Sequence, residues 1–291
     1  MRGTTLKEFS KQTQDILLSS LSKGTTTSYN VYLNTWQEYC KENKIPSHQI
    51  TIQHGIDFLT YLFHEKQYGY SAMNNARSAL SLVIPTTNNL TFGKQDIVVR
   101  FMRGIFRLRP SLPKYTVTYD PQIVMDYLST ITNMDLKALT FKLTTLLCFL
   151  TGQRNQTINS IDMSPACMED NEDEDKITFF VPTILKTTKP SSHLEPIELV
   201  AYPDETLCVV THIRLYLDVT RSVRTCNNLL LSYRSPHKAV GNRTTAGWVK
   251  STLKEAGINI KTFTTHSTRS SSTSAAGVKG LSLRRIHAFF L

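Results

Sequence analysis

The chain has 291 residues, a length that fits two domains, each able to bury a hydrophobic core of its own. Hydrophobic residues make up 40% of the sequence, which excludes a largely disordered protein, and the formal net charge of +10 favours a polyanionic partner, either nucleic acid or an acidic membrane face. No apolar run is long enough to cross a bilayer, and the N-terminal stretch MRGTTLKEFSKQTQ lacks the apolar segment of a signal peptide, so we expect an intracellular protein.

The numbers and spacing of Cys and His argue against a fold held by disulfide bonds or by a bound metal ion. The five Cys form an odd number without a CxxC pair, and the eight His are scattered singly. We therefore expect free thiols, with no metal site and no cofactor. Cys148 lies in the apolar stretch TTLLCFLTG and is expected in a core. The acidic run MEDNEDEDK at 168–176 lacks the Gly and the terminal Glu of a calcium loop, so we interpret it as a solvated loop.

The first part of the chain has helical periodicity throughout. Residues 25–45 place Tyr29, Trp36 and neighbouring apolar residues at helical spacing, and residues 51–69 repeat the pattern. A third helix is predicted over 71–84, with Ser71 as its N-cap and Gly69 in the preceding turn. A membrane-surface role would need a basic amphipathic helix with an outward apolar face, and the periodicity favours apolar faces that form a core.

The fourth predicted helix, over 95–110, carries three arginines on one face. Arg100, Arg103 and Arg107 follow at i, i+3 and i+7. The opposite face is expected to hold the apolar residues Val98, Met102, Ile105 and Phe106. The arginine face is either an ordinary solvated face or a surface for a polyanion, and the rest of the chain has to decide between these alternatives.

Pro110 and Pro113 interrupt the periodicity, so residues 110–119 are interpreted as an extended linker between two domains, 1–112 and 113–291. After the linker, helices are predicted over 121–131 and 135–152, the second largely buried and stopped by Gly152. A β-hairpin is predicted over 176–203, and three more helices over 205–223, 243–258 and 262–277. The expected fold is mainly α with a small β-sheet, an α+β architecture.

The stretch TFTTHSTRSSSTSAAG at 262–277 carries one His and one Arg among many hydroxyl residues. On a helix, His266 and Arg269 at i and i+3 share a face, and their small Ser and Thr neighbours suit a helix that lies against a phosphodiester better than one that lies in a core. Arg154, directly after a buried helix and its Gly stop, is held in a position that suits a phosphate-binding fork. The alternatives are a surface His beside an Arg, and a structural salt bridge at Arg154.

In the order Arg154, Lys186, His266 and Arg269, these residues resemble the tyrosine recombinases, the phage-integrase family. The segments LLCFLTGQRNQTI, ILKTTKP and THSTRSSSTSAA resemble the first Arg box, the β-hairpin Lys and the HxxR box of that family, and the likeness is greatest to the recombinase domains of animal mobile elements of the crypton and DIRS kind. The N-terminal helices resemble its SAM-like core-binding domain. The resemblance implies a helical core-binding domain over 1–112 and a recombinase catalytic domain over 113–291.

The resemblance also implies roles for the site residues. Arg154 and Arg269 would hold the scissile phosphate, and His266 would assist by hydrogen bonding or acid–base transfer. Lys186 would protonate the leaving 5′ oxygen, with Lys189 as the alternative on the same turn. Thr157 stands where many members carry an acidic residue. The residues expected to contact DNA are Arg77, Arg100, Arg103, Arg107, Lys189 and Arg243.

The nucleophile of the resembling family is a Tyr that follows the HxxR Arg by roughly thirty residues and forms a phosphotyrosine intermediate. No Tyr follows Tyr233 in this sequence, which ends at Leu291, and His287 is interpreted as an ordinary surface residue. We therefore expect a chain truncated before its nucleophile that binds DNA without cleaving it. It would be either a fragment of an active mobile-element recombinase or a host-adopted, non-catalytic DNA-binding regulator.

A type IB topoisomerase shares these catalytic residue types, but the compact helical N-terminal domain argues against it. The expected partner is double-stranded DNA, with no membrane. The resemblance implies a homotetramer on DNA in the complete form, a monomer for this chain in isolation, and a nuclear location, or the nucleoid in a prokaryote.

Overall fold

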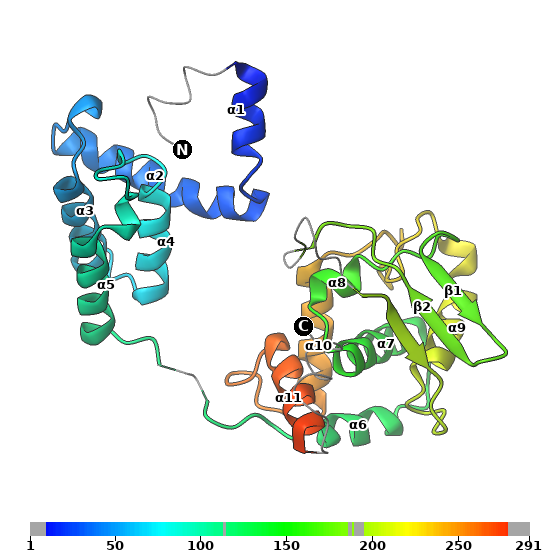
Figure 1. Cartoon of the computed structure of the whole chain (residues 1–291). Coiled ribbons are helices and arrows are strands. Elements are labelled where there is room, and N and C mark those ends of the chain that lie inside the picture. Colours follow the sequence, from blue (N-terminus) through cyan, green and yellow to red (C-terminus); the bar gives the residue numbers. More distant parts are fainter. Residues whose placement is uncertain (1–9, 113–114, 186–187, 189–194, 279–291) are drawn as a thin grey trace. The chain divides into compact units, whose positions relative to one another are not determined.

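A computed structural model describes residues 10–112, 115–185, 188 and 195–278. The chain divides into two compact units, Met1–Pro113 and Lys114–Leu291. Both are built mainly of helices, and the second also carries a three-stranded antiparallel sheet (Figure 1). The predicted fold class, mainly α with a small β-sheet, is therefore confirmed.

Within its described residues, unit 1 is built of helices joined by loops, with a single β-bridge between Thr87 and Leu90. Each predicted helix is present, although Ser71 lies inside its helix, which begins at Tyr70 with Gly69 as the N-cap residue. The prediction of Ser71 as the cap was wrong, because Gly69, two residues earlier, has the extended backbone of an N-cap residue (ψ 167°). The helices are α1 (Lys11–Leu18), α2 (Lys23–Glu42), α3 (Ile52–His64), α4 (Tyr70–Leu80) and α5 (Asp96–Leu108), with 3-10 turns at Ser47–Gln49 and Phe92–Lys94.

The core of unit 1 forms where α2, α3, α4 and α5 turn their apolar faces inward. Trp36 of α2 packs against Phe58 of α3, with ring centroids 5.1 Å apart. Gly55 lets α3 approach the segment before α5 closely, because a Cβ at this position would lie 2.5 Å from side-chain atoms of Ile84 and Phe92. Burial of these side chains fixes the positions of the helices that carry the arginines.

Helix α5 separates an apolar face from a basic one. Val98, Met102 and Ile105 are buried, as predicted, and the arginine face is exposed. The prediction for Phe106 was wrong, because its side chain is 43% exposed. Phe106 follows Arg103 by three residues, a spacing that places both on the same side of a helix, so it extends the basic face rather than the core.

Unit 2 is organised around α7 (Leu136–Thr151), which is buried along most of its length and is packed by α9, α10 and α11 (Figure 1). Cys148 is buried in this core, as predicted. Gly152 ends α7 in the left-handed conformation, with φ 56°. The other helices are α6 (Pro121–Thr130), α8 (Asn155–Asn159), α9 (Val209–Thr220), α10 (Asn242–Glu255) and α11 (Thr265–Val278), with a 3-10 turn at Arg221–Val223.

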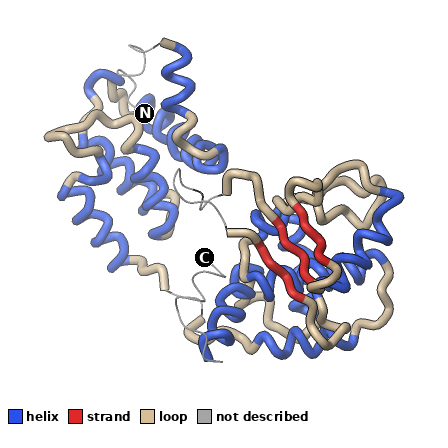
Figure 2. Tube along the Cα trace, turned by 45° about the vertical axis from the view of Figure 1, so that its right-hand side comes forward, coloured by secondary structure: helices blue, strands red, loops and turns tan. Residues whose placement is uncertain are grey.

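The sheet of unit 2 has the order β1 (Met168–Asn171), β2 (Lys176–Phe179) and β3 (Ile197–Val200), all antiparallel (Figure 2). The pairing of β2 with β3 confirms the predicted hairpin, with Phe179 opposite Ile197. Its buried face, which includes Ile177 and Leu199, joins the core around α7.

The interpretation of the acidic run as a solvated loop holds for residues 172–175, which form an exposed turn, but was wrong for its first residues, which form the edge strand β1. Most of the β1 side chains are exposed, so the strand tolerates carboxylates that a central strand would not. Arg214 of α9 also offsets their mutual repulsion through ion pairs to Asp170 at 2.7 Å and to Asp175 at 3.2 Å.

Candidate nucleic-acid interface

Helix α11 carries His266 and Arg269 and is held in place through its other residues. Ser267 Oγ accepts a hydrogen bond from the backbone N–H of Thr264 at 3.0 Å and is hydrogen-bonded to Tyr115 Oη at 2.9 Å. One turn later, Ser271 Oγ donates to the carbonyl of Tyr119 at 2.9 Å. Hydrogen bonds thus hold the segment from Tyr115 to Tyr119 along α11.

The hydroxyl-rich sequence of α11 serves close packing more than phosphate contact. Ser267, Thr268 and Ser271 are 3% exposed or less and face the interior of unit 2. The interpretation that this helix suits a phosphodiester better than a core was wrong for these three residues. Small side chains let α11 pack closely against α6 and α7, and their hydroxyls find partners nearby, so burial costs little.

Arg154 is the N-cap residue of α8, directly after the turn that ends α7. Its backbone is extended (φ −73°, ψ 150°), its carbonyl accepts a hydrogen bond from Ile158 N–H at 3.1 Å, and its residue surface is half-buried. Within the described residues no carboxylate forms an ion pair with Arg154, so the alternative of a structural salt bridge finds no support there. Its position is set by the backbone of two helices.

Arg154 and Arg269 act on one another electrostatically, although they are far apart in the sequence. The pKa of Arg269 is lowered from its ordinary value, first by burial of the guanidinium and then by repulsion from the charge of Arg154. His266 is exposed in the first turn of α11, three residues before Arg269. The structure therefore gathers two positive charges in one part of unit 2, with an imidazole on the helix that carries one of them.

Two like charges that are brought together repel, and burial of the Arg269 guanidinium removes water that would stabilise its charge. A bound anion would offset both effects. Perturbed charged groups of this kind are typical of functional sites.

Of the other residues named in the prediction of the site, Thr157 lies in α8 and Arg243 lies in the neighbouring helix α10. Thr157, where many members of the resembling family carry an acidic residue, is buried in α8. Arg243 is exposed in the first turn of α10, beside Asn242, whose Oδ1 accepts from Asn159 Nδ2 of α8 at 2.7 Å. The start of α10 is therefore fastened to the helix that begins at Arg154.

The two predicted hairpin lysines, Lys186 and Lys189, lie outside the described residues, as does His287. Next to them, Leu185 is buried, and its backbone N–H donates to Thr188 Oγ1 at 2.9 Å.

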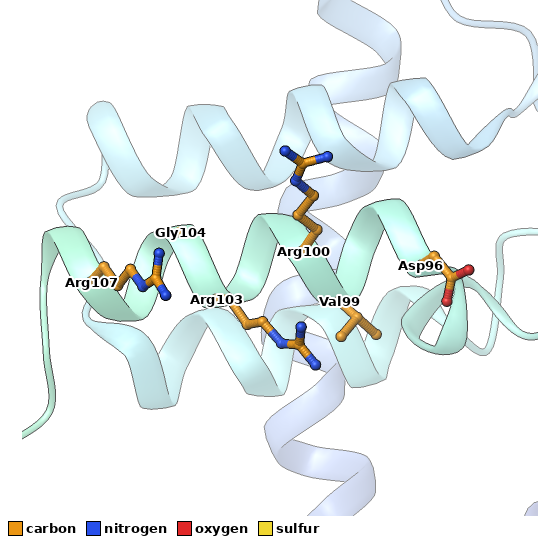
Figure 3. Close-up of a pocket in the computed structure, with 6 residues that line it drawn as sticks. All are labelled: Asp96, Val99, Arg100, Arg103, Gly104 and Arg107. Carbon is orange, nitrogen blue, oxygen red and sulfur yellow. The ribbon is translucent and has the colours of Figure 1, made fainter.

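In unit 1, the arginine face of α5 lines an open groove of about 560 Å³ (Figure 3). Arg100, Arg103 and Arg107 are exposed, and no described carboxylate forms an ion pair with them, although Asp96 lies at the start of the same helix. Gly104 between them leaves open space where a side chain would stand.

Arg77 of α4 differs from these three arginines. It is half-buried, and its Nε is buried without a hydrogen-bond partner in the structure. Its aliphatic stem lies 3.5 Å from the position of a Cβ on Gly93. Much of this side chain packs within unit 1, so it offers less surface to a ligand than Arg100 does.

Tyr115 and Tyr119 are the residues near the site that the sequence analysis did not single out. Both rings pack against Phe263, with centroids 4.9 and 5.1 Å away, just before α11 begins. The sequence did contain a signal for this packing, because two aromatic residues are unusual in a solvated linker. In the described part of the chain, no cluster of His, Cys, Asp or Glu could hold a metal ion, and no helix is long and apolar enough to span a bilayer.

No known family profile matches the chain, and no curated protein resembles it in sequence. Its fold is similar to that of solved recombinases and integrases. A XerH site-specific recombinase bound to palindromic difH substrate has a TM-score of 0.62 at 14% identity, covering 91% of this chain and 72% of that one. A Tn1549 transposon integrase in complex with transposon right end DNA has a TM-score of 0.62 at 12% identity, covering 93% and 86%. A lambda integrase tetramer bound to a Holliday junction has a TM-score of 0.54 at 16% identity, covering 94% and 73%. The chain therefore has the fold of the tyrosine recombinases and integrases.

Proposed function

We propose that this protein binds duplex DNA and that Arg154, His266 and Arg269 hold one of its phosphodiester groups. The observation that carries the proposal is the repulsion between Arg154 and Arg269, two cations that the fold brings together in unit 2. It is supported by the similarity in fold to a XerH recombinase, a Tn1549 integrase and lambda integrase, each solved with DNA.

The chemistry of the site follows from its groups. Guanidinium groups can bind both non-bridging oxygens of a phosphodiester through paired hydrogen bonds, and they offset the negative charge that grows when a nucleophile attacks phosphorus. His266, exposed on α11, would donate a hydrogen bond or transfer a proton at the same phosphate. Lys186, with Lys189 as the alternative, would protonate the departing oxygen.

The arginine face of unit 1 would supply a second contact to the DNA backbone. From Arg100 to Arg107 the axis of α5 rises about 10 Å, which matches the rise of about three base-pair steps if α5 lies parallel to the duplex axis. Arg243 at the start of α10 would add a contact from unit 2, and Arg77 a weaker one from unit 1.

The finer proposal is a site-specific recombinase of a mobile element, of the crypton or DIRS kind, that works in the nucleus or the nucleoid and assembles as a tetramer on DNA, with this chain monomeric in isolation. The second candidate is a non-catalytic DNA-binding regulator. The gathered Arg154 and Arg269 favour it equally, because guanidinium groups bind phosphate without cleaving it. A trapping assay with a nicked suicide substrate separates the two when it is run on this chain and on a chain extended past Leu291, because strand cleavage by a Tyr leaves a covalent protein–DNA adduct. An adduct that forms only after extension supports the recombinase, and no adduct with either chain supports the regulator.

The experiment that tests DNA binding is a titration of the full chain with duplex DNA at several salt concentrations. We expect affinity to fall steeply with salt, and Arg154→Gln or Arg269→Gln to weaken binding by about 10- to 100-fold, the value of one or two charge-assisted hydrogen bonds. The matched control is Arg221→Gln, which removes the same charge from an exposed arginine already paired with Asp218 at 3.1 Å. Salt-independent binding, or equal losses in all three variants, would contradict the proposal.

A further inference from the structure

A second, smaller groove lies beside the arginine face of α5. Its volume is about 310 Å³, and it is lined by Tyr70, Arg103, Phe106 and Arg107. Two of its residues, Arg103 and Arg107, also line the larger groove of Figure 3, so the two grooves share a wall of positive charge. The smaller groove differs from the larger one in having aromatic side chains.

The aromatic side chains are held in position but left accessible. Tyr70, in the first turn of α4, meets Phe106 with ring centroids 5.2 Å apart and an interplanar angle of 75°. This edge-to-face contact fixes the orientation of Phe106, yet 43% of that residue stays exposed. A large apolar ring that is ordered by a neighbour and still faces solvent is suited to receive another flat surface.

The positive charge around Phe106 indicates which kind of planar ligand could stack on its ring. Arg103 precedes it by three residues and Arg107 follows it by one, and neither forms an ion pair with a carboxylate in the described part of the chain. An aromatic platform flanked by free cations complements a ligand that joins a planar π system to an anion, as a nucleotide does. The volume is near the lower end for small-molecule sites and suits a single base.

We propose that this groove binds one unpaired base of a DNA strand, stacked on Phe106, while Arg103 and Arg107 hold the phosphates on either side of it. The inference rests on the proposed function, because it needs DNA along α5. Within a duplex both faces of each base are covered by its neighbours, so the platform can accept only a base that has left the stack. The groove would thus stabilise locally opened DNA.

The test compares two duplexes that differ only in one bulged fluorescent adenine analogue, titrated with the full chain. The wild type should prefer the bulged duplex by about 5- to 100-fold, the value of one stacked base, and should quench the fluorescence of the analogue. Phe106→Ala should abolish both the preference and the quenching while keeping the affinity for the paired duplex, and Phe106→Tyr should retain them. Ile97→Ala, which removes another exposed apolar side chain from α5 outside the groove, is the matched control and should behave as the wild type.

The outcomes separate this inference from the function on which it rests. If the wild type binds the paired duplex but shows no preference for the bulged one, the inference is overturned and DNA binding stands. If it binds neither duplex, the proposed function fails as well. A Phe106-dependent complex with an acidic helical peptide, without preference for the bulged duplex, would assign the groove to a protein partner instead.

Discussion

Replacing Arg154 by Gln should make the free protein more stable and at the same time weaken DNA binding. The substitution removes the charge that repels Arg269. Coupling between partly exposed charges is about 0.2–1 kcal/mol, so the free energy of unfolding should rise by up to about 1 kcal/mol. For a unit of this size, a gain of about 1 kcal/mol corresponds to a rise in Tm of about 2–4 °C.

The assay is thermal unfolding followed by the fluorescence of Trp248, which is buried in unit 2 against Phe141. The chain has two Trp, so a Trp36→Phe background makes Trp248 the only reporter. At about 1 M salt the gain should shrink, because the screening length falls to about 3 Å. A Tm that is unchanged or lower in Arg154→Gln would refute the reasoning, since it would make Arg154 a structural partner rather than an anion ligand.

Three further predictions concern the framework and the DNA surface. Gly55→Ala should destabilise unit 1 by about 1–3 kcal/mol in urea unfolding, because the added methyl group would overlap Ile84 and Phe92; a neutral result would contradict the close packing of α3. Burial lowers the pKa of His212, so the unfolded chain binds a proton that the folded chain does not. The free energy of unfolding should therefore fall as the pH drops below 6.5, the ordinary pKa of His. His212→Gln should flatten this dependence of stability on pH, and an unchanged slope would contradict the role of His212. Arg103→Gln should reduce the slope of log affinity against log salt by about 0.9, and a slope equal to that of the wild type would place the DNA elsewhere.

Much of the fold could be predicted because its helices depend on local patterns. The apolar periodicity of α2, α3 and α5 and the glycine after α7 are recorded in neighbouring residues, and the structure confirms them. The pairing of β2 with β3 could also be predicted, since both strands carry apolar residues in alternation.

The features that the sequence did not predict depend on tertiary contacts. Strand β1 is acidic, and its carboxylates are accommodated because most of them face solvent and because Arg214 approaches from α9. Lys142 in α7 is fully buried, where its Nζ donates to the carbonyl of Ile131 at 3.2 Å and burial lowers its pKa. Arg214 lies 44 residues from Asp170, and Ile131 lies 11 residues from Lys142, so neither contact follows from the local helix or strand pattern.

The candidate site divides in the same way. Residue types and their order indicated Arg154 and Arg269, but only the fold gives the electrostatic contact between them. The hydroxyls of α11 suggested a phosphate surface, but Ser271 packs inside unit 2. The sequence could not show this, because a helix that faces a phosphate and a closely packed helix of small residues have similar compositions.

The central claim is that Arg154 and Arg269 hold the same phosphate, and a double-mutant cycle of DNA affinity tests it most directly. If both bind one group, the losses from Arg154→Gln and Arg269→Gln should be strongly non-additive, with a coupling of about 0.5–3 kcal/mol. Strictly additive losses would mean that the two guanidinium groups bind separate phosphates, and the account of a single site would be wrong.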